Sequence, residues 1–101
     1  MEWVKVAQRN EIPEATGIEV MAGNHVVALF REGDEVYALD GICPHAGGPL
    51  AQGCVAGGIV TCPWHGWQFE IATGQHCLTK TLQHKSFPVE LRNNEVWVGI
   101  D

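Results

Sequence analysis

The sequence predicts an all-β fold, a small antiparallel β-sandwich or barrel. Short apolar runs alternate with turn signals along all 101 residues, and several neighbouring runs are joined by two-residue turns rich in Gly and Asn. No stretch combines a helical period with capping residues. A chain of this length fits one domain, residues 1–101, whose core is small enough for a bound group to help hold it together.

The first half of the chain is expected to contain four strands and a loop. Gly23-Asn24 separates two apolar runs and is a hairpin signal, because both residues tolerate positive φ. Residues 10–14 are expected to form a loop, since Pro13 cannot donate to a β-ladder. The expected strands are residues 3–6, 18–22, 25–31 and 35–39.

The second half begins with an irregular segment. Residues 40–58 are rich in Gly, Pro and Ala and show no regular period. After it, large apolar and polar residues alternate as in a half-buried strand, and a turn follows at residues 72–74. Asn93-Asn94 suits a type I′ turn and joins the last two strands. The expected strands are residues 58–61, 67–71, 86–91 and 95–100.

Composition excludes several classes of function. The net charge is −6, from 12 acidic and 6 basic residues without a Lys/Arg cluster, which argues against a nucleic-acid partner. The acidic surface suits a basic partner and solubility alone equally well. No apolar run approaches the roughly 18 residues that span a bilayer, and the N-terminus does not resemble a signal peptide. We therefore expect a cytoplasmic protein, in which four cysteines favour a metal site over disulfides.

Two short motifs each offer one thiol and one imidazole. Cys43 and His45 form C-x-H, and after sixteen intervening residues Cys62 and His65 form C-x-x-H. Two Cys and two His could bind a single zinc ion, but structural zinc sites usually space the ligands of one pair by about two to five residues. The single residue between Cys43 and His45 is tight for one metal and natural when the two ligands reach different irons of one cluster.

The motifs C-P-H-A-G-G-P-L at residues 43–50 and C-P-W-H-G-W-Q-F-E-I-A-T-G at residues 62–74 resemble those of Rieske [2Fe-2S] proteins. The resemblance implies that Cys43 and Cys62 bind one iron of a [2Fe-2S] cluster and that His45 and His65 bind the other. It also implies the Rieske fold, a small all-β domain with the cluster between two loops at one tip.

Four positions bear on the kind of Rieske protein. In high-potential members of the family, each ligand loop carries an extra Cys, and a Ser and a Tyr donate hydrogen bonds to the cluster sulfur and a ligand Cys. The corresponding residues here are Gly48 and Trp64 for the disulfide, Trp67 for the Ser and Phe69 for the Tyr. Hydrogen bonds to cluster sulfur raise the potential, so their absence predicts a low-potential centre.

The expected function is that of a soluble one-electron carrier and not of an enzyme, because the chain shows no second chemical site. By resemblance, it takes electrons from a flavin-dependent NAD(P)H ferredoxin reductase and passes them to a terminal Rieske oxygenase of a ring-hydroxylating dioxygenase system. The alternative is a Rieske-type small subunit of an assimilatory nitrite reductase or of another multi-subunit oxidoreductase. A non-redox interaction module is disfavoured, since all four ligands are present.

The cysteines and histidines outside the two motifs are weaker candidates for a role at the metal site. We expect Cys54 and Cys77 to be small, partly buried thiols, and His25, His76 and His84 to have surface or structural roles. Glycines in the ligand motifs are expected to let the backbone approach the cluster, and Trp64 to shield it from water. Many relatives have a proline-containing third loop beside the cluster, whereas residues 76–82 contain no proline.

Overall fold

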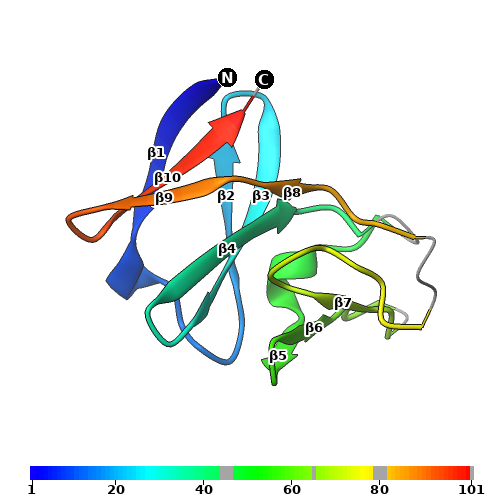
Figure 1. The fold of residues 1–101 in the computed structure, drawn as a ribbon. Coiled ribbons are helices and arrows are strands. Elements are labelled where there is room, and N and C mark those ends of the chain that lie inside the picture. The colour runs from blue at the N-terminus through cyan, green and yellow to red at the C-terminus, as the bar shows by residue number, and fades with distance from the viewer. Residues whose placement is uncertain (44–46, 65, 79–81, 101) are drawn as a thin grey trace.

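The structure, a computed structural model, describes residues 1–43, 47–64, 66–78 and 82–100, and it confirms the all-β prediction. Its strands form three small antiparallel sheets (Figure 1). The first contains β1 (Glu2–Gln8), β10 (Glu95–Ile100) and β9 (Val89–Arg92), in that order. The second contains β2 (Ile18–Ala22), β3 (His25–Glu32), β4 (Glu35–Asp40) and β8 (Ser86–Phe87), and the third contains β5 (Cys54–Ala56), β6 (Ile59–Thr61) and β7 (Gln68–Glu70).

The sheet of β2, β3, β4 and β8 supplies residues to two hydrophobic cores. Along β3, Val27 and Leu29 belong to a core shared with β9 and β10, while Ala28 and Phe30 belong to a core shared with β6 and β7. Successive side chains of a strand point to opposite faces, so one strand can contribute to both cores. This explains why β3 is a nearly continuous apolar run and does not alternate.

The predicted hairpin turns form where the sequence places them. Gly23 has φ 61° between β2 and β3, and Asn93 and Asn94 have φ 52° and 73° between β9 and β10. Two consecutive positive φ values at Asn93-Asn94 fit the predicted type I′ turn, whose twist matches that of the strands it joins. Strand pairing continues directly to both sides of these turns, with Ala22 opposite His25 and Arg92 opposite Glu95.

The prediction of one strand over residues 86–91 was wrong, because Pro88 divides it into β8 and β9. β8 pairs with β4 in one sheet, whereas β9 pairs with β10 in another. Proline lacks the N–H that a continuous ladder would need at this position. The Pro88 carbonyl accepts a hydrogen bond from the Gly99 N–H of β10 at 2.9 Å. The chain therefore leaves the sheet of β4 at this residue and joins the sheet of β10.

Three short elements within expected loops were also missed. Strand β5 lies in the segment expected to be irregular, and it pairs with β6 through a turn at Gly57 and Gly58, whose φ values are 59° and 77°. A strand of three residues is too short to show a period. The 3-10 turns η1 (Arg9–Glu11) and η2 (Leu50–Gln52) likewise occupy single turns within expected loops. Among the described residues, no helix is long and apolar enough to cross a membrane.

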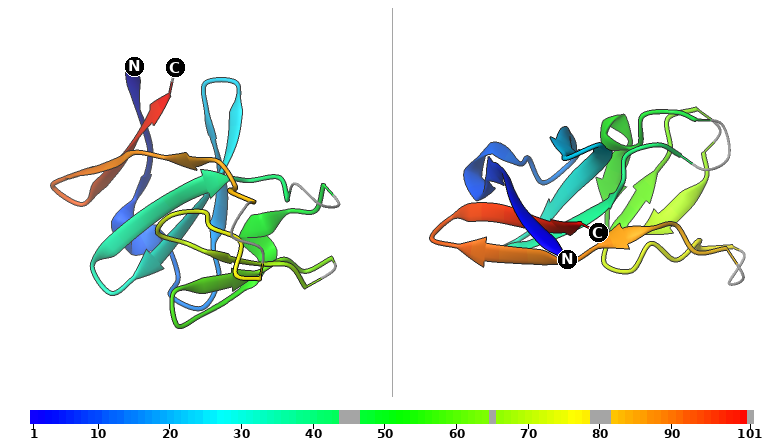
Figure 2. Two further views of the ribbon diagram at one scale, coloured as in Figure 1. Left: turned by 45° about the vertical axis from the view of Figure 1, so that its right-hand side comes forward. Right: turned by 90° about the horizontal axis from the view of Figure 1, so that it is seen from above.

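The described residues of the connections from β4 to η2 and from β6 to β7 lie at the same end of the molecule, as the two views in Figure 2 show. These connections carry the two predicted ligand motifs. The first is fixed at its base, because the Gly41 N–H donates to the Val26 carbonyl at 2.9 Å and the Leu50 N–H donates to the Gly41 carbonyl at 3.0 Å. The second is fixed by the antiparallel pairing of β6 with β7.

Candidate metal centre

The two motif loops share one backbone hydrogen-bond pattern. In the first, the Cys43 N–H donates to the Gly48 carbonyl at 2.8 Å, and the Gly47 N–H donates to the Cys43 carbonyl at 2.9 Å. In the second, the Cys62 N–H donates to the Trp67 carbonyl at 2.7 Å, and the Gly66 N–H donates to the Cys62 carbonyl at 3.1 Å. Each cysteine therefore begins a loop closed by the residues four and five positions later.

Glycine is needed in each loop at the position four residues after the cysteine. Gly47 has φ 73° and Gly66 has φ 76°, values that side-chain-bearing residues rarely adopt. Among the described residues, no heavy atom outside the glycine and its two chain neighbours would lie within 4 Å of a Cβ atom added at either glycine. The backbone conformation, and not crowding, therefore accounts for both glycines.

The thiols of Cys43 and Cys62 are adjacent and almost completely buried. Their residues are 1% and 2% exposed and belong to the core shared with β3, β6 and β7. Burial raises the pKa of the Cys62 thiol, the backbone N–H of Trp64 lowers it, and the adjacent Cys43 thiol raises it again. Neither cysteine forms a disulfide. The loops thus bring one thiol each to a common point, where a metal could replace both protons.

This donor set fits the cluster that the resemblance implies. Two thiols from separate loops converge, as required of the two cysteines that bind one iron of a Rieske centre. The other predicted ligands, His45 and His65, lie outside the described residues. Within the described residues, no group of three or more Cys, His, Asp or Glu side chains could hold a metal ion. The described site is therefore the cysteine half of the predicted ligand set.

Gly48 and Trp64 contact one another across the two loops. A Cβ atom on Gly48 would lie 2.8 Å from Cγ and 2.9 Å from Cδ2 of the Trp64 ring. These are the positions to which the resemblance assigns the extra cysteines of high-potential members. The sequence predicted a shielding role for Trp64, but it gave no sign that the Trp64 ring lies on Gly48, since the two residues belong to different loops.

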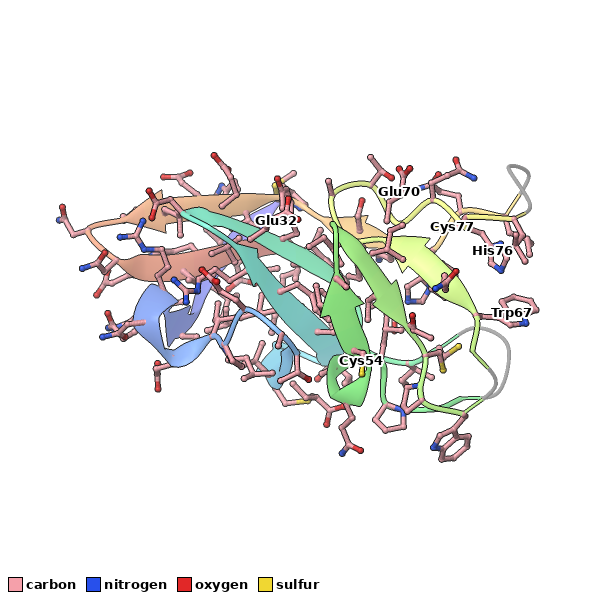
Figure 3. The ribbon with its side chains drawn as sticks, turned by 90° about the horizontal axis from the view of Figure 1, so that it is seen from below. Glu32, Cys54, Trp67, Glu70, His76 and Cys77 are labelled. Carbon is pink, nitrogen blue, oxygen red and sulfur yellow. The ribbon has the colours of Figure 1, made fainter. Side chains whose placement is uncertain are left out.

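A third segment, residues 76–78, packs against β7 through aromatic rings. The His76 ring lies edge-on to the rings of Trp67 and Phe69, at centroid distances of 4.7 and 5.2 Å. Backbone hydrogen bonds hold the segment, from the Cys77 N–H to the Gln68 carbonyl at 2.9 Å and from the His76 N–H to the Leu82 carbonyl at 3.1 Å. Figure 3 shows Trp67 and His76 at the same end of the molecule. Aromatic packing thus fixes His76, in a stretch of sequence that contains no proline.

The histidines outside the motifs have the expected structural or surface roles. His84 is buried, and its Nε2 lies 2.7 Å from the Asp40 carbonyl oxygen, which ties the chain after the third segment to the end of β4. His76 is buried, and its Nδ1 accepts a hydrogen bond from the Leu78 N–H at 3.1 Å. His25 is half-buried, with its ring edge-on to Phe87 at 5.6 Å.

The two cysteines outside the motifs differ in exposure. Cys77 is partly buried as predicted, but Cys54 is exposed, because it shares the outward face of β5 with Ala56 while Val55 between them is half-buried. Burial raises the pKa of the Cys77 thiol, and the Glu70 carboxylate raises it further. Figure 3 shows Glu70 and Cys77 near one another and Cys54 in a different part of the molecule.

We predict that iodoacetamide alkylates Cys54 several times faster than Cys77 at pH 8. Tandem mass spectrometry locates the label within the tryptic peptide 32–80, which contains both cysteines. The thiolate is the reactive form, and a raised pKa leaves less thiolate at Cys77. Glu70→Gln removes one cause of the raised pKa and should accelerate the reaction of Cys77 without changing that of Cys54. Faster alkylation of Cys77 than of Cys54 in the wild-type protein would contradict this prediction.

Comparison with known proteins matches most of the chain to one protein family. The family model described as the Rieske [2Fe-2S] domain matches residues 2–90. The chain is 29% identical over 100 residues to the ferredoxin component of the naphthalene 1,2-dioxygenase/salicylate 5-hydroxylase systems of Ralstonia sp., covering 98% of this chain and 96% of that protein. It is also 34% identical over 102 residues to the nitrite reductase [NAD(P)H] large subunit of Klebsiella oxytoca, covering 96% of this chain but only 11% of that protein.

Solved structures give the same result. The ferredoxin of carbazole 1,9a-dioxygenase from Nocardioides aromaticivorans IC177 superposes with a TM-score of 0.91 at 25% identity, over 100% of both chains. A chain from the complex of reduced oxygenase and oxidized ferredoxin in carbazole 1,9a-dioxygenase superposes with a TM-score of 0.84 at 32% identity, over 95% of this chain and 91% of that one. The similarity therefore extends over the whole fold.

Proposed function

The chain belongs to the Rieske [2Fe-2S] domain family, and from this membership we propose that Cys43, His45, Cys62 and His65 hold one [2Fe-2S] cluster. The observation that carries the proposal is the convergence of two buried thiols from loops with the same hydrogen-bond pattern. In this assignment, Cys43 and Cys62 bind one iron and the two histidines bind the other. Residues 1–101 would act as one domain, whose central sheet contributes to both hydrophobic cores.

The protein is an electron carrier, a ferredoxin component of a Rieske dioxygenase system. When bound, a [2Fe-2S] cluster accepts and releases one electron. The chain holds the cysteine ligands in the core, where both thiols are shielded from water. Its similarity to ferredoxin components covers nearly their full length, whereas its match to the nitrite reductase large subunit covers a small part of that protein. The match over nearly the full length of the ferredoxin components supports the role of a separate carrier.

The end that carries the motif loops has few charges for a partner to recognise. Residues 41–69 contain no Asp, Glu, Lys or Arg. Large apolar side chains next to this stretch and within it are exposed, among them Ile42 at 50%, Trp64 at 53% and Leu78 at 88%. An electron must leave near its cluster, so the partner must contact this end. We infer that the partner meets it with an apolar, uncharged face, and that the excess of acidic residues elsewhere on the surface has little part in docking.

Two partners follow from the proposed function. A similar ferredoxin is named in a complex with its oxygenase, which supports a terminal Rieske oxygenase as the acceptor of this chain. The names of the similar proteins describe them as components of dioxygenase systems, which supports a flavin-dependent NAD(P)H reductase as the donor. None of the four cysteines forms a disulfide, which supports a reducing, cytoplasmic compartment.

We predict a reduction potential in the lower part of the Rieske range, nearer ~−150 mV than ~+300 mV. Phe69 is 1% exposed, lies against His76 and His84, and has no hydroxyl to donate to the cluster. Without such donors, the added negative charge of the reduced state is less stabilised. Protein-film voltammetry at neutral pH measures the potential, and a clearly positive value would contradict the proposed low-potential carrier.

A further inference from the structure

Gly48 lies in van der Waals contact with the Trp64 ring, and this contact requires a residue without a side chain. A Cβ at Gly48 would approach Cγ and Cδ2 of Trp64 to 2.8 and 2.9 Å, whereas carbon atoms normally pack at about 3.5–4.0 Å. Gly48 is not among the residues with positive φ, so its backbone conformation does not demand glycine. Unlike Gly47 and Gly66, Gly48 is therefore explained by space for a ring.

The contact connects the two loops beside both thiols. The Gly48 carbonyl accepts the hydrogen bond from the Cys43 N–H at 2.8 Å, and the backbone N–H of Trp64 interacts with the Cys62 thiol. Gly48 is buried, whereas Trp64 is 53% exposed. One part of the Trp64 side chain thus covers the first loop while the rest faces solvent.

We propose that Trp64 is a positioning residue that holds the Cys43 loop against the Cys62 loop, and that Gly48 provides the space its ring requires. We call this pair the loop clamp. The inference rests on the proposed function, since the loops are taken to hold a cluster. By keeping the loops at a fixed separation and covering Gly48, the clamp slows the opening through which water or a chelator would reach the ligands.

The test is the rate at which the cluster-loaded protein loses its visible absorbance in anaerobic buffer containing EDTA. Trp64→Ala is expected to lose absorbance about 10-fold faster than wild type, because it removes the contact between the loops. Trp64→Phe retains ring atoms at the two positions that contact Gly48 and should stay within about 2-fold of wild type. Met21→Ala, a truncation of an exposed apolar residue on β2, is the matched control and should leave the rate unchanged.

Substitution of Gly48 provides a second and independent test of the contact with Trp64. Gly48→Ala forces the ring away and should accelerate loss about as much as Trp64→Ala does, while Gly48→Ala combined with Trp64→Ala should be no faster than Trp64→Ala alone. If Gly48→Ala cannot be loaded, Trp64→Ala in the same chain should restore loading, because the methyl group then has room. The electron spin resonance spectrum of each reduced variant reports whether the cluster environment itself has changed.

The inference is overturned if Trp64→Ala loses absorbance at the wild-type rate, or if Gly48→Ala is equally harmful with and without the Trp64 ring. An equal effect of Met21→Ala would also overturn it, since any exposed apolar residue would then act in the same way. Failure of the proposed function would look different, because the wild-type protein would then contain no two-iron cluster to lose.

Discussion

Cys43→Ser and Cys62→Ser are each expected to yield a colourless protein without bound iron, whereas Cys54→Ser and Cys77→Ser retain the full visible spectrum. The two motif thiols are adjacent and buried, and each would supply one of the two cysteine ligands of the proposed cluster. Cys54 is exposed and Cys77 is partly buried in the third segment, outside the two motif loops. Iron content and absorbance after purification measure the effect.

Folding must be checked separately, because the core near the two thiols could depend on the cluster. Far-ultraviolet circular dichroism of the Cys62→Ser protein should still show a β-rich spectrum, since the core shared by β3, β9 and β10 contains neither thiol. Full iron content in either motif variant, or loss of iron in both Cys54→Ser and Cys77→Ser, would contradict the ligand assignment.

Ile42→Glu is expected to slow electron transfer to the oxygenase that the wild-type protein reduces by at least about 10-fold. Ile42 is half exposed and precedes Cys43, so a carboxylate there would be desolvated in an apolar interface without a partner. Stopped-flow measurement of oxygenase reduction gives the rate. The same measurement should change little between low and high ionic strength for the wild-type protein, because few charges lie at the docking end.

Two control variants separate docking from other effects of the new charge. Met21→Glu places the same charge on an exposed residue of β2 and should leave the rate unchanged. Ile42→Gln removes the apolar side chain without adding charge and should cause a smaller loss. The reduction potential of each variant shows whether the driving force has changed. A rate for Ile42→Glu equal to that of wild type, or a steep fall of the wild-type rate with salt, would contradict an uncharged docking surface.

Local patterns in the sequence predicted most of the fold. The continuous apolar run of residues 25–31 indicated a strand, and the structure explains the run by the contribution of β3 to two cores. The division at Pro88 was missed because a change of sheet depends on which strands are neighbours in space, and not on the residues beside the proline. Strand β5 was missed because three residues show no period.

The site could be predicted only in part, because the sequence shows spacing within a motif but not contacts between separate loops. Cys43 and Cys62 stand in motifs whose spacing is visible in the sequence, and the structure brings their thiols together. The role of the other two ligands, His45 and His65, stays a prediction. The contact between Gly48 and Trp64 could not be predicted, because it joins residues of separate loops and depends on how the loops face one another.

The most direct test of the central claim is pulsed electron spin resonance of the reduced protein, produced with nitrogen-15-labelled histidine, together with iron and sulfide analysis. We predict two irons and two labile sulfides per chain and magnetic coupling to the nitrogens of two histidines. Substitution of His45 or His65 should remove one of these couplings or the whole centre. A colourless protein with one zinc ion per chain, or an iron centre without histidine coupling, would contradict the assignment of a Rieske cluster to these loops.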